Sequence, residues 1–316
     1  MERLTSGTRL PDKVRGGVIA LGNFDGFHRG HQAVVARAIT RARAEGRPAI
    51  VATFDPHPAR FFRPQVPPFR LTTLDQRARL FEAAGADAML VIDFNEAIAA
   101  LDPRAFVSER LIDRFGAAAV VTGRDYTFGA RRAGSVALLA ELGAELGLAT
   151  ETVEAVEDAG GPISSSRIRD ALVAGDCAEA ERLMTRPFAI RGEVIHGAKL
   201  GRSIGFPTAN LELGDYQRPR YGIYAVRARL DDGRVVDGAA NLGIRPSFDP
   251  PKELLEPSFF DFAGDLYGRT IEVALIHFIR PEAKYESLEA LTAQIDRDCA
   301  EARHILGRRA PGLDWA

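Results

Sequence analysis

The hydrophobic pattern of the first half of the chain predicts strands that alternate with helices. Short apolar runs predict strands at residues 18–21, 49–54, 88–94, 117–122 and 149–156. Amphipathic segments predict helices at residues 31–45, 73–85, 102–115 and 135–146. Thr73 to Gln76 resembles a capping box, and Asp102-Pro103 reads as an N-cap followed by proline at the first helical position. Continuous apolar strands between helices are typical of a parallel sheet that is covered on both faces.

The pattern changes after about Thr185. Between residues 190 and 278, glycine, proline and short alternating runs predominate, and strands are predicted at residues 221–230, 235–240 and 270–278. These strands predict a small antiparallel barrel. A terminal helix is predicted to begin at Ser287, with one apolar stripe that consists of Leu288, Leu291, Ile295, Ala302 and Leu306. We therefore predict an N-terminal Rossmann-like α/β domain with a parallel sheet at residues 1–184 and a C-terminal antiparallel β-barrel domain with a terminal helix at residues 185–316.

Length, charge and cysteine content limit the classes of protein to consider. A chain of 316 residues is long enough for two domains, each with its own core. The net charge of -2 gives no electrostatic signature of nucleic-acid binding. Cys177 and Cys299 fit no metal or redox spacing, which favours a reducing compartment. The polar stretch 1–13 has no secretory signal, and no apolar run approaches the roughly 18–20 residues of a membrane helix, so we expect a cytoplasmic protein.

A glycine-rich segment with two histidines lies between the first predicted strand and its helix. Residues 22–31 read Gly-Asn-Phe-Asp-Gly-Phe-His-Arg-Gly-His. The carboxyl end of a parallel strand is where α/β sheets bind ligands, and a helix N-terminus there offers free N–H groups to a phosphate. Two imidazoles on the first turn can donate hydrogen bonds to phosphoryl oxygens. The alternative is a glycine turn with two surface histidines, but strand, glycines, histidines and helix together favour a nucleotide site.

A serine-rich segment follows the last predicted strand of this half and opens another helix. Residues 163–169 read Ile-Ser-Ser-Ser-Arg-Ile-Arg. Three hydroxyl groups at a helix start can be no more than an N-cap. Paired with the histidine segment, however, they resemble the nucleotidyltransferase superfamily, which includes class I aminoacyl-tRNA synthetases. The synthetases carry a lysine where this chain has Arg167 and Arg169, so a small-molecule adenylyltransferase fits better.

The superfamily resemblance implies that both segments bind the triphosphate of ATP. The ATP-binding residues expected from it are Gly22, Asn23, Phe24, Asp25, Gly26, His28, His31, Ser164, Ser165, Ser166 and Arg169. His28 and His31 are also the residues expected to take part in catalysis.

Two further segments narrow the resemblance. Residues 53–58 read Thr-Phe-Asp-Pro-His-Pro, and residues 123–129 read Gly-Arg-Asp-Tyr-Thr-Phe-Gly, each at the end of a predicted strand. Together they resemble the FMN adenylyltransferase domain of bacterial bifunctional FAD synthetases. That resemblance implies flavin binding by Phe54, Asp55, His57, Asp125, Tyr126 and Phe128. Tyr126 stands where phenylalanine is expected and still supplies a ring.

The second half carries a different phosphate motif. Residues 192–199 nearly spell a Walker A loop, but Leu200 replaces the required serine or threonine, and a barrel is the wrong context. Residues 205–210 read Gly-Phe-Pro-Thr-Ala-Asn and closely resemble the riboflavin kinase signature. The resemblance implies that Thr208 and Asn210 hold Mg²⁺ and that ATP is bound by Gly197, Lys199, Gly201, Arg202, Thr208 and Asn210. A hydroxyl and an amide oxygen suit Mg²⁺ as hard ligands, whereas the alternative is a Pro-Thr turn with an asparagine cap.

Glu256 is the candidate catalytic base by resemblance. In riboflavin kinases a glutamate five residues before an Asp-Phe pair has this role, and Glu256 stands in that place before Asp261 and Phe262. Ser258 stands where the family often has histidine, so no role of that histidine is transferred. Residues 241–246, Asn-Leu-Gly-Ile-Arg-Pro, continue the resemblance. Without it, a glutamate in a β segment is usually a solvated charge.

The resemblance spans about residues 16–306 and implies two successive reactions. ATP would phosphorylate riboflavin to FMN, and a second ATP would adenylylate FMN to FAD with release of pyrophosphate. One alternative is a single-activity enzyme that uses its other half for binding or regulation, and another is a synthetase-like nucleic-acid-binding protein. The expected ligands are Mg²⁺, ATP, riboflavin and FMN, with flavoproteins as recipients of FAD. We expect no nucleic-acid or membrane partner, and the oligomeric state stays open.

Overall fold

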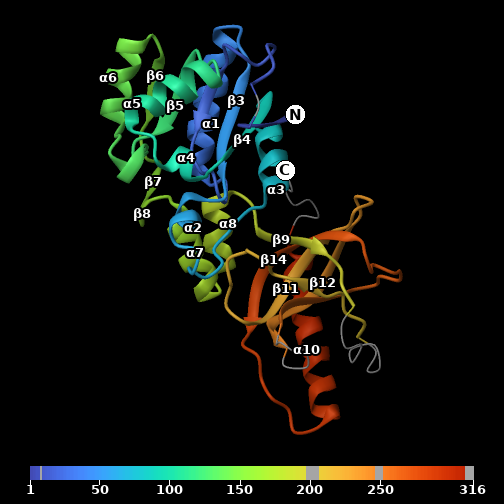
Figure 1. Cartoon of the computed structure of the whole chain (residues 1–316). Coiled ribbons are helices and arrows are strands. Elements are labelled where there is room, and N and C mark those ends of the chain that lie inside the picture. The colour runs from blue at the N-terminus through green and yellow to red at the C-terminus, as the bar shows by residue number, and fades with distance from the viewer. Residues whose placement is uncertain (8, 197–205, 246–251, 310–316) are drawn as a thin grey trace. The chain divides into compact units, whose positions relative to one another are not determined.

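The computed structural model describes residues 1–7, 9–196, 206–245 and 252–309. Contacts divide the chain into two compact units (Figure 1). The first unit contains residues 1–67 and 74–164, and the second contains residues 68–73 together with the described residues from Ser165 to Arg309. Among the described residues, no helix combines the length and the apolar character that crossing a membrane requires.

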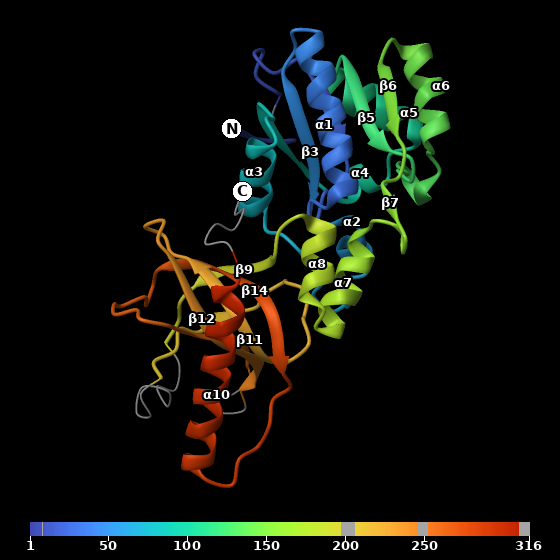
Figure 2. The same ribbon diagram turned by 180° about the vertical axis from the view of Figure 1, so that it is seen from behind.

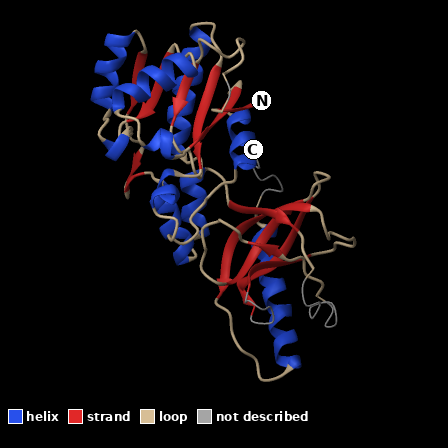
Figure 3. Cartoon of the chain, viewed as in Figure 1, coloured by secondary structure: helices blue, strands red, loops and turns tan. Residues whose placement is uncertain are grey.

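The first unit is built on a six-stranded sheet in which every neighbouring pair is parallel (Figure 3). Its strands are β1 (Glu2–Thr5), β2 (Val18–Leu21), β3 (Ala49–Asp55), β4 (Ala88–Asp93), β5 (Ala119–Gly123) and β6 (Ala149–Val153). Their order in the sheet is β1-β4-β3-β2-β5-β6. The order reverses between β2 and β5, which creates the topological switch point where such sheets bind ligands.

Helices cover both faces of this sheet (Figure 2). They are α1 (Arg29–Ala44), α2 (Pro58–Phe62), α3 (Leu74–Ala83), α4 (Glu96–Ala99), α5 (Pro103–Ala105), η1 (Phe106–Arg114), η2 (Ala130–Arg132) and α6 (Val136–Leu146), and a small hairpin of β7 (Glu157–Asp158) and β8 (Gly161–Pro162) follows. In β2, Ile19 packs into the same core as Leu111 of η1, whereas Val18 packs with Val34 of α1. Successive strand residues therefore face opposite cores, as predicted for a sheet covered on both sides.

Two local features differ from the sequence prediction. The polar N-terminal stretch contains β1, an edge strand that pairs with β4 and buries Leu4. The helix predicted at residues 102–115 starts as expected, since Asp102 accepts a hydrogen bond of 2.8 Å from the Ala105 N–H, but it continues as the π-helix η1. Its hydrogen bonds reach back five residues instead of four, which a hydrophobic pattern does not reveal.

The second unit contains a six-stranded antiparallel sheet in the order β10-β13-β12-β11-β14-β9. Its strands are β9 (Phe188–Glu193), β10 (Leu211–Glu212), β11 (Gly222–Arg229), β12 (Val235–Arg245), β13 (Lys252–Phe259) and β14 (Thr270–Arg280). The two edges meet where the N–H of Ile195 donates to the carbonyl of Asn210 at 2.9 Å. This bridge gives the near-barrel form that the sequence predicted.

In the described part of the second unit, three helices accompany this sheet: α7 (Ser165–Ala174), α8 (Cys177–Met184) and α10 (Leu288–Gly307). Ser287 caps α10 as predicted, and Ala302 and Leu306 pack against Ala225 and Ala239. The predicted apolar stripe does not extend to the first turn, where Leu288 is exposed. Helix α7 packs against α8, and α8 contacts β9 and β14.

Three strands of the second unit were not predicted: β9, β10 and β13. Strand β13 reads Lys-Glu-Leu-Leu-Glu-Pro-Ser-Phe, so charge and proline obscure its alternation. Leu254 and Leu255 are both buried, which shows that this strand is covered on both faces. The strands predicted at 235–240 and 270–278 also continue further, to Arg245 and Arg280.

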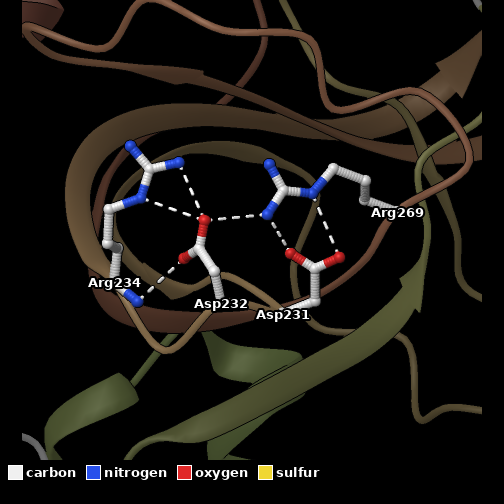
Figure 4. Close-up of polar contacts among 4 residues, drawn as sticks. All are labelled: Asp231, Asp232, Arg234 and Arg269. Carbon is white, nitrogen blue, oxygen red and sulfur yellow. Dashed lines mark hydrogen bonds and ion pairs between the residues drawn. The ribbon is translucent and has the colours of Figure 1, made fainter.

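An exposed network of ion pairs joins the turn after β11 to the start of β14 (Figure 4). Arg269 contacts both Asp231 and Asp232, and Arg234 contacts Asp232 at 2.8 Å. The hydrogen bond from Arg269 holds the pKa of Asp231 below its usual value. The pKa of Asp232 is lowered further, first by Arg234 and then by Arg269.

This network predicts a loss of stability in acid. A carboxylate whose pKa is lower in the folded chain stabilises it above the unfolded pKa of about 3.9, and that stabilisation is lost as the pH falls through the folded pKa. We expect Arg269→Gln to lower the thermal midpoint by no more than roughly a few degrees at pH 7, because the pairs are exposed. The difference from the wild type should shrink between about pH 4 and pH 2 in thermal melts followed by circular dichroism.

Arg297→Gln is the matched control for this measurement. Arg297 donates to the amide oxygen of Gln294 and to no described carboxylate. Its loss should give a difference that does not depend on pH. If the thermal midpoint of Arg269→Gln lay below that of the wild type by the same amount from pH 7 to pH 2, the stabilisation would not come from the ionised carboxylates.

Candidate active sites

The loop after β2 has a strained backbone that aromatic contacts hold in place. Phe24 has a φ of 49° and Phe27 a φ of 40°, in the left-handed region that a bulky residue rarely adopts. Both rings are buried and meet Phe81 of α3 edge to face, with centroids 5.9 Å and 5.1 Å away. The loop that carries the predicted ATP-binding residues is therefore fixed from the side of α3.

His28 and His31 lie together at the start of α1. His28 is the N-cap, and its Nδ1 accepts a hydrogen bond of 3.3 Å from the backbone N–H of His31. The two rings stack with centroids 3.6 Å apart and planes inclined by 20°. Because Nδ1 of His28 accepts, the proton of the neutral ring is on Nε2.

The sequence did not single out Arg77, a buried residue of α3 that supports this loop. Its guanidinium lies 3.5 Å from the Asp25 carboxylate, and both side chains are 2% exposed. It also donates to Thr53 Oγ1 at 2.9 Å and to the carbonyl of Asn23 at 3.2 Å. Thr53 in turn donates to the Asn23 carbonyl at 2.7 Å, so α3 and the end of β3 together hold the loop after β2.

Arg77→Met should lower the free energy of unfolding of the first unit by about 3–5 kcal/mol, because a buried carboxylate then loses its guanidinium. The control is Arg43→Met, which breaks an exposed ion pair with Asp87 and should cost at most about 1 kcal/mol. Urea unfolding of both variants measures the difference. Equal costs would mean that the Asp25–Arg77 pair is no more important than a surface pair.

Two polar atoms at the carboxyl edge of the first sheet are buried without a hydrogen-bond partner among the described residues. They are Oδ1 of Asn23, just after β2, and Oγ1 of Thr122, near the end of β5. These strands flank the switch point. A buried polar atom without a partner is costly, so this edge has hydrogen-bonding capacity that a ligand would satisfy.

The flavin residues predicted after β3 separate into a supporting set and an exposed set. Phe54 is buried and meets Phe94 edge to face at 5.8 Å, so it belongs to the core beneath the edge. His57 caps α2, since its Nδ1 accepts from the Ala59 N–H at 3.1 Å. Phe62 of α2, which the sequence analysis did not name, packs on Phe94 at 5.7 Å and is 62% exposed. Asp55 is partly exposed at the end of β3.

The residues predicted after β5 show the same division. Phe128 is buried against Phe106, with centroids 5.6 Å apart. Tyr126 stacks on Phe128 at 6.0 Å, and burial raises the pKa of its hydroxyl above the usual value. Asp125 is exposed. Tyr126 and Phe128 therefore form the packed base of this loop, and Asp125 is the member of the set that solvent reaches.

The serine-rich segment is divided between the two units. Ser164 ends the first unit, whereas Ser165, Ser166 and Arg169 start the second. Within the second unit, Arg169 donates to the carbonyl of Phe69 at 2.8 Å, and its guanidinium lies 5.0 Å from the centre of the Phe69 ring. Arg169 thus holds residues 68–73 against α7.

The register of the second sheet aligns the candidate kinase residues. Glu256 on β13 is paired with Asn241 on β12, and Leu255 is paired with Leu211 on β10. Extending the second register by one residue sets Asn210 opposite Glu256, and the Ala209 N–H donates to the Pro257 carbonyl at 2.9 Å as this register requires. Paired residues of antiparallel strands point to one face, so Asn210, Glu256 and Asn241 form a row. Thr208 lies two residues before Asn210, in a segment without regular secondary structure.

Arg245 links Glu256 to a second carboxylate. Its Nε donates to Oε2 of Glu256, and its Nη1 donates to Oε1 of Glu282 at 2.9 Å. Gly243 makes room for Glu282, because a Cβ at that position would come within 2.6 Å of the carboxyl group. Burial lowers the pKa of the Arg245 guanidinium, but the carboxylates of Glu256 and Glu282 outweigh this effect and raise it, so Arg245 stays charged.

Glu253, the nearest other glutamate, belongs to a separate cluster. It lies three residues before Glu256 on β13, and an odd spacing along a strand places two side chains on opposite faces. Its Oε2 accepts from Arg218 at 2.6 Å, and its Oε1 accepts from the Tyr221 hydroxyl. The hydrogen bond from Arg218 holds the pKa of Glu253 below its usual value.

The predicted kinase loop residues Gly197, Lys199, Gly201 and Arg202 lie outside the described residues. Thr208 is partly exposed and Asn210 is buried. Among the described residues, no group of three or more histidine, cysteine, aspartate or glutamate side chains is arranged to hold a metal ion.

Comparison with known proteins matches each part of the chain to a protein family. The FAD synthetase family model matches residues 10–167, and the riboflavin kinase model matches residues 184–306. The chain therefore contains the two transferase domains of flavin cofactor synthesis. It is 41% identical over 297 residues to the bifunctional riboflavin kinase/FMN adenylyltransferase of Pseudomonas fluorescens, with 94% of this chain and 95% of the relative covered. The Bacillus subtilis relative of the same name is 38% identical, with 90% and 91% covered.

The chain belongs to the family of bifunctional riboflavin kinase/FMN adenylyltransferases. A crystal structure of a protein described as a macrolide-efflux protein from Streptococcus pneumoniae has the same fold, with a TM-score of 0.85 and 30% identity over 98% of this chain and all of that chain. Both predicted domains and their order are those of the family. The segment between the two family matches, which contains most of α7 and most of α8, groups with the second unit by its contacts, and the boundary at 184/185 stays a prediction.

Proposed function

We propose that residues 185–316 transfer the γ-phosphoryl group of ATP to the 5′-hydroxyl of riboflavin, and that residues 1–184 then join FMN to AMP from a second ATP. One observation carries the kinase assignment: Asn210, Glu256 and Asn241 stand in a row on one face of the sheet, with Thr208 two residues before Asn210 along the chain. A carboxylate next to hydroxyl and amide oxygens is suited to a reaction that removes a proton and handles phosphate charge.

In the kinase reaction, Glu256 is the general base. Arg245 occupies Oε2 of Glu256, so Oε1 is the oxygen that can take the proton of the riboflavin hydroxyl. The hydroxyl oxygen then attacks the γ-phosphorus of ATP, and ADP leaves. Positioning the two reactants and removing this proton are the contributions we assign to the protein.

The donor atoms around this row fit Mg²⁺. Thr208 contributes a hydroxyl oxygen and Asn210 an amide oxygen, which are the hard ligands that this ion accepts from proteins alongside water and phosphate. Mg²⁺ bound there would neutralise negative charge on the phosphate oxygens of ATP. Two protein ligands are few, as expected for an ion that keeps several bound water molecules.

In the adenylyltransferase reaction, the FMN phosphate attacks the α-phosphorus of ATP and pyrophosphate leaves. No covalent enzyme intermediate is needed. We assign His28 and His31 the role of donors to oxygens that gain charge in the transition state. The hydrogen bond from the His31 N–H to Nδ1 of His28 fixes the orientation of the His28 ring for this role as a donor. We further propose that Asp55, Asp125 and the exposed ring of Phe62 contact the flavin.

A chromatographic assay tests this proposal. The purified chain is incubated with riboflavin, ATP and Mg²⁺, and the flavins are separated over time. FMN should appear first and FAD should follow. FMN alone or FAD made only from added FMN would indicate a single-activity enzyme, and neither product would contradict the assignment. We also propose a cytoplasmic site of action, with flavoproteins as recipients of the FAD.

A further inference from the structure

Asn241 carries hydrogen-bonding capacity that nothing in the described structure uses. Its side-chain Oδ1 is buried and has no hydrogen-bond partner among the described residues. Asn241 lies on β12 directly opposite Glu256, and Asn210 extends the row on the other side of Glu256. An amide oxygen is therefore held without a partner beside the proposed catalytic base.

The neighbours of Asn241 on the same face do not satisfy this oxygen. Two residues before it, Ala239 packs against α10, and two residues after it, Gly243 has no side chain. The carboxyl group of Glu282 fills the space over Gly243 and accepts from Arg245. Glu256 is itself an acceptor, so it cannot donate to Asn241 while it is ionised.

A buried acceptor without a partner costs free energy, so a strand retains one where a ligand satisfies it. The ligand group must donate a hydrogen bond and must lie next to the hydroxyl that Glu256 deprotonates. The acceptor substrate has such groups, because the reacting hydroxyl of riboflavin is one of several on adjacent carbons of its polyol chain. A hydroxyl next to the reacting one meets both conditions.

We propose that Asn241 is a substrate-binding residue that accepts a hydrogen bond from a non-reacting hydroxyl of the polyol chain. The inference rests on the kinase function proposed above. It identifies Asn241 as the residue through which the site would prefer a polyol substrate to an alcohol with a single hydroxyl group. Asn241 would orient the chain so that the terminal hydroxyl reaches Glu256. It takes no part in removing the proton.

The test compares two flavin substrates in the wild type and in Asn241→Ala. One substrate is riboflavin. The other is the flavin with a 5-hydroxypentyl chain, which keeps the terminal hydroxyl and lacks the other three. Asn241→Ala should lower kcat/KM for riboflavin by about 3- to 10-fold, the usual effect of one neutral hydrogen bond. The same substitution should change kcat/KM for the hydroxypentyl flavin by less than about twofold, because that acceptor has no hydroxyl for Asn241 to bind.

An equal decrease in kcat/KM for both flavin substrates, or no decrease for riboflavin, would overturn the proposal. A failure of the kinase assignment looks different, since the wild type would then phosphorylate neither acceptor. Asn241→Val, which suits a strand and has no hydrogen-bond acceptor in its side chain, replaces the alanine variant if the latter does not fold. Neither variant should have a lower thermal midpoint than the wild type without ligand, because no protein hydrogen bond is lost, whereas a purely structural asparagine would lower it.

Discussion

Glu256→Gln is expected to lower kinase turnover by roughly 10²–10⁴, the usual contribution of a general base. Glutamine keeps the shape of the side chain and still accepts from Arg245, but it does not take up the substrate proton. The KM for ATP should change little, because Thr208 and Asn210 are unaltered. When FMN is supplied directly, FAD formation should run at the wild-type rate. Steady-state assays with riboflavin and with FMN measure the two activities separately.

Glu253→Gln is the matched control for this substitution. It changes the same residue type on the same strand but on the opposite face, where Arg218 and Tyr221 bind the carboxylate. It should retain most kinase turnover. If Glu253→Gln were inactive and Glu256→Gln active, the base would lie on the other face, and the row with Asn210 would not be the site.

Replacing His28 or His31 with alanine is expected to lower the rate of FAD formation by about 10²–10³, the usual cost of losing a preorganised donor to a charge that develops in the transition state. FMN formation from riboflavin should continue at the wild-type rate. His28→Ala also removes the N-cap of α1, which should cost about 0.5–2 kcal/mol of stability, so thermal unfolding is measured beside activity.

His304→Ala is the control, because His304 is an exposed residue near the end of α10. It should leave both activities unchanged. Near-normal FAD formation by both His28→Ala and His31→Ala would mean that the two histidines have only structural roles, as a helix cap and as the ring stacked on it.

The central strands of the first sheet were predictable because they are buried on both faces and therefore read as continuous apolar runs. The edge strand β1 was not, because only Leu4 of its four residues is buried. The π-helix η1 begins with the predicted cap, and its hydrophobic pattern does not distinguish a five-residue from a four-residue hydrogen bond. These differences reflect local geometry that a pattern of apolar positions does not encode.

The candidate sites divide in the same way. The segment with His28 and His31 was predictable because its chemistry lies in adjacent residues after a strand. In the second unit, the family resemblance named Asn210 and Glu256, but their alignment with Asn241 was not predictable, because only strand pairing brings the three residues together. Arg77 looks like a solvated charge on a helix, and its role depends on the buried Asp25 that it meets in the fold. Phe62 carries no local signal apart from being aromatic.

The central claim is that two separate sites on one chain catalyse successive steps. The most direct measurement is one chromatographic flavin balance for two variants. Given riboflavin, ATP and Mg²⁺, His31→Ala should accumulate FMN with little FAD. Given FMN, ATP and Mg²⁺, Glu256→Gln should form FAD at the wild-type rate, although it makes almost no FMN from riboflavin. If either single substitution abolished both activities in a folded protein, the two reactions would share a site and the account would be contradicted.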